Sequence, residues 1–229
     1  MKSKILLFFV IIFLVCPAVI YSYVFFTSAN LSSLPPLQDG DLVFHTGDSG
    51  QTLAILMASG SLYSHMGLIK IGADGNPLVV EAAGPVRETP LQEWIARGWF
   101  GRLTVMRVRG LTPKYAKKLL EAAKIYYGKP YDPFFLFEKE RIYCSELVYW
   151  AFKEGIGVEI GQVQSFRELE YENGAVQSLI LLRWEKYPPC LESGIDELDE
   201  CLSLIYEQNL ITPISIAKDR RIETIYSNY

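Results

Sequence analysis

The chain has 229 residues and a formal net charge of −4, from 22 Lys and Arg and 26 Asp and Glu. This charge, without any basic cluster, argues against a nucleic-acid-binding protein, because phosphate contacts need a positively charged stripe. Half of the residues are hydrophobic and 13% are aromatic, which is enough for one folded core. With two histidines and no closely spaced His, Cys, Asp or Glu residues, we predict no metal site and no cofactor.

Residues 1–29 are predicted to be a transmembrane anchor or a signal segment. Residues 5–26 carry no charged side chain and follow Lys2 and Lys4. About 20 apolar residues cross a bilayer as a helix, and lysines ahead of them keep the N-terminus in the cytoplasm. We therefore expect the rest of the chain on the outer face of the membrane. Small residues at 27–29 also permit cleavage, but the apolar run is longer than most signal peptides have, which favours an anchor.

Residues 30–36, rich in Ser and Pro, are predicted to be an extended linker, and residues 37–229 to be one domain. The first expected elements are a strand over 42–44, a helix over 51–59, and a hairpin of strands 66–71 and 78–82. The next are a helix from Thr89-Pro90 to Arg97, a strand over 103–108, and helices over 112–128 and 143–155. A possible strand over 178–184 and a helix opening at Thr212-Pro213 complete the pattern. Helices mixed with short strands favour an α+β fold, in which an antiparallel sheet packs against helices.

Cys144 is the candidate nucleophile. It lies in the first turn of the helix expected over 143–155, on the apolar face, where unpaired backbone N–H groups stabilise a thiolate and could also hold an oxyanion. A lone cysteine on an apolar helix face is otherwise most often a buried structural residue. A catalytic role therefore requires a base that takes the thiol proton.

His65 is the candidate base, and Glu81 is the candidate residue that orients it. Glu81 stands in an otherwise apolar strand, where a carboxylate is costly to bury without a donor, and an imidazole on the neighbouring strand would supply one. A two-residue turn in the hairpin would put the two side chains on opposite faces of the sheet. The Cys144, His65 and Glu81 triad therefore requires a loop with an odd number of residues, or a bulge.

Four segments carry a resemblance to a known family: Asp39-Gly40-Asp41-Leu42-Val43-Phe44, Leu62-Tyr63-Ser64-His65-Met66-Gly67, Glu81-Ala82 and Tyr143-Cys144-Ser145-Glu146-Leu147-Val148. Together they resemble the permuted papain-like amidases of the YiiX/YaeF type, which belong with the NlpC-type hydrolases. In that family a circular permutation places the catalytic His before the Cys. The resemblance implies a circularly permuted papain-like fold, and the predicted leader places it in the bacterial cell envelope. It also implies that Cys144 attacks an amide or ester carbonyl, His65 moves the proton and Glu81 holds His65.

Other residues allow two interpretations each. Tyr63, Tyr131 and Tyr143 are candidate substrate-binding residues, although core packing explains such aromatic side chains equally well. His45 is interpreted as pocket lining or surface, and Ser145 as a helix cap rather than the nucleophile. Cys190 and Cys201 either form a disulfide, which an exported domain permits, or remain two thiols.

The resulting hypothesis is an envelope cysteine hydrolase that acts through an acyl-enzyme on a peptide, amide or acyl-lipid substrate. The alternatives are an acyltransferase, which shares the covalent step, and a non-catalytic lipid- or peptide-binding protein on the same fold. Thiol reactivity distinguishes the binding protein from the two enzymes, because a working nucleophile has a depressed pKa.

Overall fold

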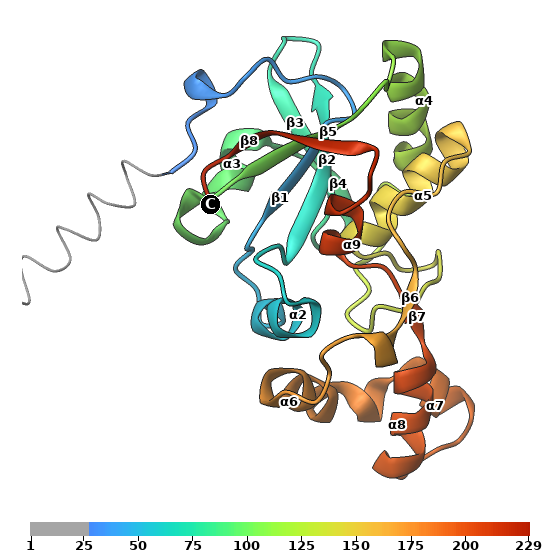
Figure 1. Ribbon diagram of the computed structural model, residues 1–229. Coiled ribbons are helices and arrows are strands. Elements are labelled where there is room, and N and C mark those ends of the chain that lie inside the picture. The colour runs from blue at the N-terminus through green and yellow to red at the C-terminus, as the bar shows by residue number, and fades with distance from the viewer. Residues whose placement is uncertain (1–27) are drawn as a thin grey trace, which may run out of the picture.

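The computed structural model describes residues 28–229 (Figure 1). The predicted membrane segment, residues 5–26, lies outside this range. Between residues 28 and 229, no helix combines the length and the apolar character that a bilayer crossing needs.

An antiparallel sheet forms the centre of the fold. Within the described residues it has six strands in the order β4-β3-β2-β1-β5-β8. These are β1 (Leu42–His45), β2 (His65–Ile71), β3 (Pro77–Ala82), β4 (Val86–Pro90), β5 (Thr104–Val108) and β8 (Ile222–Ser227). Two further short strands, β6 (Gln164–Ser165) and β7 (Asn209–Leu210), pair with each other. The predicted α+β class with an antiparallel sheet is confirmed.

Helices cover both faces of the sheet (Figure 1). α4 (Pro113–Lys124) and α5 (Cys144–Ile156) pack on one face, and α3 (Leu91–Ala96) packs on the other. α6 (Gly174–Arg183), α7 (Pro188–Glu192) and α8 (Leu198–Glu207) gather at one end of the molecule, beyond α2 (Thr52–Ser59). The remaining elements are α9 (Pro213–Ala217) and the 3-10 turns η1 (Leu31–Ser33), η2 (Trp99–Gly101), η3 (Phe166–Glu168) and η4 (Trp184–Lys186).

Alternation along the strands divides the core into two clusters. Phe44, Met66 and Val80 face α5 and belong to the larger cluster. Their neighbours Val43 and Val79 face α3 and belong to the smaller one. Because side chains alternate along a strand, His45, His65 and Glu81 project toward the α3 side of the sheet.

The segment predicted as a linker, residues 30–36, is partly folded. Asn30 caps η1 by accepting a hydrogen bond from the backbone N–H of Ser32 at 3.0 Å. The preceding residue, Ala29, is buried in the smaller core cluster and donates its N–H to the carbonyl of Gly101 at 2.9 Å. The chain is therefore attached to the domain from Ala29 onward.

The predicted cap at Thr89 is wrong. Thr89 and Pro90 end strand β4, which the sequence analysis missed, and α3 begins one residue later without a side-chain cap. The Thr89 hydroxyl instead donates to the Glu81 carboxylate at 2.6 Å. A Thr-Pro pair favours a helix start, but pairing of β4 with β3 uses the same residues for the sheet.

The predicted strand over 178–184 is also wrong, because residues 174–183 form α6. Asn173 caps this helix by accepting from the backbone N–H of Val176 at 3.1 Å. The buried side chains Val176 and Ile180 are four residues apart, which is the spacing of one helix face. The run of apolar residues concealed this helical spacing. Strand β8, near the C-terminus, was not predicted either.

Cys190 and Cys201 form a disulfide that joins α7 to α8, with Cα atoms 5.6 Å apart. The bond closes a short loop, because the two residues are 11 positions apart. We expect that replacing both cysteines with serine lowers the free energy of unfolding by about 2 to 3 kcal/mol, since the unfolded chain regains loop entropy. Urea denaturation under oxidising conditions measures this change. Equal midpoints for the double variant and the parent would contradict it.

Candidate active site

Cys144 is the first residue of α5 and is almost fully buried. Burial by itself would raise the pKa of its thiol. Hydrogen bonding to His65, the charge of that ring, and the backbone N–H groups of Met66 and Ser145 act in the opposite direction and lower the pKa overall. The helix N-terminus adds its positive partial charge. The sulfur is therefore in surroundings that stabilise a thiolate.

His65 links the thiol to a buried carboxylate. Its Nε2 lies 2.7 Å from Oε2 of Glu81, so Nδ1 is the ring nitrogen left for the sulfur. Burial would lower the pKa of His65, but its bonds to Cys144 and Glu81 raise it to about 9. Burial would likewise raise the pKa of Glu81, but the bond to His65 and further donors lower it to about 2. The three groups favour a thiolate and an imidazolium near neutral pH.

The register of the hairpin explains how His65 and Glu81 meet. Leu68 pairs with Val80 and Ile71 with Pro77. The connecting loop, residues 72–76, has the odd number of residues that the triad requires, and it is closed by a 2.8 Å bond from the N–H of Gly72 to the carbonyl of Asn76. His65 and Glu81 consequently share one face as diagonal neighbours, within reach of each other.

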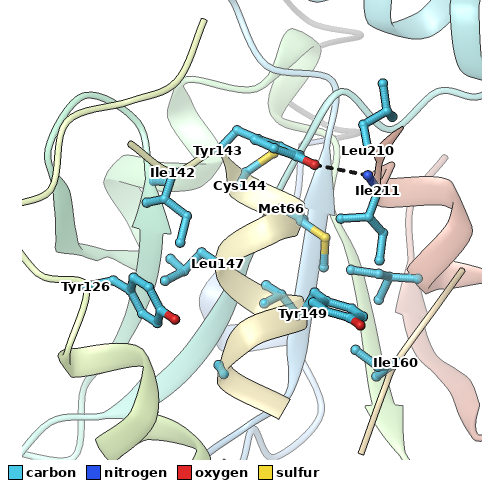
Figure 2. Packing of buried hydrophobic residues seen from close by; sticks show 14 of the residues in the cluster. Met66, Tyr126, Ile142, Tyr143, Cys144, Leu147, Tyr149, Ile160, Leu210 and Ile211 are labelled. Atoms are coloured by element: carbon cyan, nitrogen blue, oxygen red, sulfur yellow. Dashed lines mark hydrogen bonds between the residues drawn. The ribbon is translucent and has the colours of Figure 1, made fainter. Parts of the chain in front are cut away.

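Cys144 approaches from the opposite face of the sheet. The side chains of Cys144 and His65 can nevertheless meet, because each stands at the end of its element. His65 is the first residue of β2, and Cys144 is the first residue of α5. Figure 2 shows Cys144 at the start of the helix, with Met66 of β2 beside it. The ends of one strand and one helix thus bring together residues that are 79 positions apart, from 144 minus 65.

Glu81 accepts hydrogen bonds from two side chains that the sequence did not indicate. Besides His65, its carboxylate accepts hydrogen bonds from the hydroxyl of Thr89 and from the guanidinium of Arg97, which follows α3. The carboxylate is fully buried, so each donor offsets part of the cost of burying its charge. Nothing in the sequence pattern singles out Arg97, because it stands at a helix end where charged residues are common.

Gly67 makes room for the His65 and Glu81 pair. A Cβ atom at this position would lie 2.5 Å from Cγ1 of Val79 and 2.8 Å from the carbonyl of Val80. We expect Gly67→Ala to lower the free energy of unfolding by about 1 to 3 kcal/mol through overpacking. The midpoint of urea unfolding measures this. Gly50→Ala is the control, because no atom lies within 4 Å of a Cβ there; equal midpoints for both variants would contradict the expectation.

Two cavities meet at the candidate site. One is almost entirely apolar and is lined by Cys144, Tyr143, and side chains of α6 and α8 that include Val176, Ile180 and Ile205. The other exposes more polar surface, although much of its lining is also apolar; it is lined by His45, His65, Arg97 and Tyr131 among others, and we call it the polar cleft. Ser64, Pro133 and Arg183 border both. The thiol and the imidazole therefore lie at the boundary between an apolar pocket and a polar cleft.

The hydroxyl of Tyr131, which lines the polar cleft, is held by a chain of hydrogen bonds from Gln51 and Arg183. It accepts a hydrogen bond from Nε2 of Gln51 at 2.6 Å, and Oε1 of Gln51 accepts two from the guanidinium of Arg183 at 3.1 Å each. Burial and the nearby charge of Cys144 raise the pKa of Tyr131, so the hydroxyl keeps its proton. Because the oxygen accepts from Gln51, its hydrogen is available to a substrate oxygen.

The other tyrosines selected from the sequence have different surroundings. Tyr143 lines the apolar pocket, and its hydroxyl accepts from the backbone N–H of Ile211 at 3.0 Å (Figure 2). Tyr63 lines neither cavity. Its hydroxyl donates to Thr104 and its ring packs 5.1 Å from that of Phe44.

His45 and Ser145 differ from parts of their sequence interpretations. His45 lines the polar cleft but is not a surface residue: it is buried and its ring stacks on Trp94 at 3.7 Å. Burial lowers its pKa well below the usual value, so this ring is neutral. Ser145 does not cap α5, whose cap residue is Tyr143; its hydroxyl donates to the carbonyl of Ile211 at 2.8 Å.

Comparison with known proteins gives consistent matches. The model of the family described as permuted papain-like amidase enzyme, YaeF/YiiX, C92 family, matches residues 36–226. The chain is 39% identical over 159 residues to a protein of Escherichia coli strain K12 that is named uncharacterized protein YiiX, covering 69% of this chain and 78% of that protein. It also matches the crystal structure of YiiX from Escherichia coli O157:H7, with a TM-score of 0.73 and 33% identity, over 83% of this chain and 97% of that one.

The YiiX protein of that crystal structure is described as a metalloprotein. In residues 28–229 of this chain, no group of three or more His, Cys, Asp and Glu side chains is arranged to hold a metal ion. The described side chains therefore do not fit a resident metal.

Proposed function

The chain belongs to the permuted papain-like amidase family, and from this we propose that it is a cysteine hydrolase with a Cys144, His65 and Glu81 triad. The observation that carries the proposal is the continuous link from a thiol at a helix N-terminus, through an imidazole, to a buried carboxylate 2.7 Å from that imidazole. A third group that orients the base is the arrangement by which papain-like enzymes activate a thiol.

In the proposed acylation step, the Cys144 thiolate attacks the carbonyl carbon of an amide or ester. A sulfur–carbon bond forms, and the carbonyl electron pair moves to the oxygen, where the hydroxyl of Tyr131 donates a hydrogen bond. As the carbonyl reforms, the bond to the leaving amine or alcohol breaks. His65 gives that leaving group its proton, which produces a thioester and a neutral imidazole.

In the proposed deacylation step, the neutral His65 takes a proton from water while the oxygen attacks the thioester carbonyl. Collapse of this intermediate expels the Cys144 thiolate and releases the acid. The thiolate and imidazolium are then restored. Glu81 stabilises the charged ring in both steps, since its own pKa of about 2 keeps it ionised.

The two cavities support a substrate whose acyl part and leaving group bind in different places. The apolar pocket beside Cys144 suits the acyl part of an amide or ester, and the polar cleft beside His65 suits the leaving amine or alcohol. An acyl-lipid or an N-acylated amine fits this division better than a polar peptide on both sides. An acyltransferase would use the same acyl-enzyme and an amine or alcohol in place of water.

The proposed location is the bacterial cell envelope, with residues 5–26 as the anchor and the domain on the periplasmic side. The uncharged apolar run after Lys2 and Lys4 supports this location. The disulfide between Cys190 and Cys201 also supports it, because disulfides persist in oxidising compartments.

A protein that binds an acyl chain without turnover is the second candidate, and the apolar pocket is the observation that favours it. Incubation with p-nitrophenyl esters from acetyl to dodecanoyl, followed by acid quenching and intact mass measurement, separates the two. The hydrolase gives nitrophenol release and an acyl mass on Cys144, at rates that rise with chain length. Unmodified Cys144 that alkylates no faster than a model thiol would favour the binding protein instead.

A further inference from the structure

Exposed apolar side chains gather around one buried residue, Thr46. Its carbonyl accepts the backbone N–H of Trp99 at 2.8 Å, its N–H donates to the hydroxyl of Tyr229 at 2.7 Å, and its hydroxyl donates to the carbonyl of Leu62 at 2.6 Å. Trp99, Tyr229, Leu62 and Phe100, which follows Trp99, have exposed fractions of 42, 41, 60 and 57%. We call these four residues the exit cluster.

The exit cluster lies where the predicted membrane segment meets the domain. The hydroxyl of Ser28 donates to the carbonyl of Phe100 at 3.0 Å, and the N–H of Ala29 donates to the carbonyl of Gly101 at 2.9 Å. Ser28 stands two positions after Phe26, the last residue of the uncharged run. The contacts of Ser28 and Ala29 with η2 therefore follow directly after the predicted membrane segment in the sequence.

The cluster is held firmly. Asn228 fixes the C-terminal residues by donating its N–H to the carbonyl of Leu103, and it accepts the N–H of Leu103 on its side chain at 2.7 Å. Figure 1 shows the C-terminus next to the loop between α3 and β5. Phe100 has a φ of 57°, a left-handed conformation that costs free energy for a bulky residue and here leaves its ring exposed.

We propose that the exit cluster lies in the headgroup region of the bilayer and that it turns the polar cleft toward the membrane surface. Tryptophan and tyrosine are enriched at this depth, where the ring is apolar and its polar edge stays hydrated. Trp99 also lines the polar cleft with His65. The occupant of the cluster is therefore lipid, and the substrate class is an amphiphile that the bilayer itself holds. This inference rests on the proposed function for its substrate and on the retained anchor for its geometry.

The burial of Ala29 bears on whether the anchor is retained. Cleavage after Ala29 would remove a residue that is 5% exposed and part of the smaller core cluster. It would also remove the bonds from residues 28 and 29 to η2. Retention keeps these contacts and holds the exit cluster close to the end of the apolar run.

The test uses the full chain in vesicles of phosphatidylcholine and phosphatidylglycerol whose acyl chains carry bromine either near the headgroup or near the bilayer centre. Bromine quenches tryptophan only at short range. We expect quenching by the shallow bromines, and loss of most of it in Trp99→Phe. Trp150→Phe is the matched control, because Trp150 lies on α5 against Lys139 and Lys153, and it should keep the quenching.

Three results would overturn the proposal. The first is equal quenching in Trp99→Phe and the parent, and the second is an intact mass showing that the protein in the membrane fraction begins at Asn30. The third is a Trp99 that is shielded from acrylamide yet not quenched by brominated lipid. The last result would identify a protein partner. Hydrolysis of p-nitrophenyl acetate, which is soluble in water, reports on Cys144 in the same samples. Failure of the membrane geometry and failure of the hydrolase are thereby distinguished.

Discussion

Replacing Cys144 with alanine is expected to remove hydrolytic activity by at least about 10³-fold and to leave the fold intact. The sulfur is the atom that forms the acyl-enzyme, and enzymes that lose such a nucleophile lose a factor of this size or larger. The fold is retained because alanine is compatible with the helix and removes only one sulfur atom, although that atom is buried. Release of nitrophenol from p-nitrophenyl esters measures activity, and urea unfolding measures the fold.

Ser145→Ala is the matched control for the choice of nucleophile. Its hydroxyl is engaged with the carbonyl of Ile211, so this variant should lose about 1 kcal/mol of stability and keep most of its activity. Activity that survives in Cys144→Ala and disappears in Ser145→Ala would reverse the assignment. Full activity in both variants would eliminate the thiol mechanism.

The contact between His65 and Glu81 could be predicted from local chemistry together with the register of the sheet. A carboxylate at 81 in an apolar strand requires a partner, and His65 on the neighbouring strand meets that requirement at 2.7 Å. The odd loop that this pairing needs is present at residues 72–76, and the register from Leu68 to Val80 confirms it. Sequence reasoning succeeded here because strand alternation is a strict geometric rule.

The donors around this pair were missed because they depend on tertiary pairing. Thr89 was interpreted as a helix cap, since Thr-Pro is a common helix start, and the pairing of β4 with β3 that turns it toward Glu81 spans only five residues. Arg97 and Arg183 each stand at a helix end, where a charged residue is ordinarily a solvated one. Their contacts with Glu81 and Gln51 become visible only after the chain is folded.

The apolar pocket was missed for a related reason. Residues 178–184 were interpreted as a possible strand, and the short apolar run 179–182 within them does not by itself distinguish a strand from a helix segment. As α6, this segment places Ile180 and Arg183 on the walls of the cavities. The misassigned helix is thus the one that shapes the acyl side of the proposed site.

Replacing Glu81 with glutamine is expected to lower kcat by about 10² to 10⁴-fold, because the base loses the charge that orients it and stabilises its protonated form. His65 has a pKa of about 9 partly through this carboxylate, so its pKa should fall in the variant. Activity requires an ionised thiol and a protonated imidazole and therefore follows a bell-shaped pH profile. The alkaline limb, near pH 9 in the parent, should move to lower pH.

Thr89→Val is the matched control for Glu81→Gln. Thr89→Val removes one donor to Glu81 and no charge, so it should cost about 1 kcal/mol and leave the alkaline limb close to its place in the parent. If Glu81→Gln kept both the parent kcat and the parent alkaline limb, the carboxylate would be a structural residue and the base would act without it.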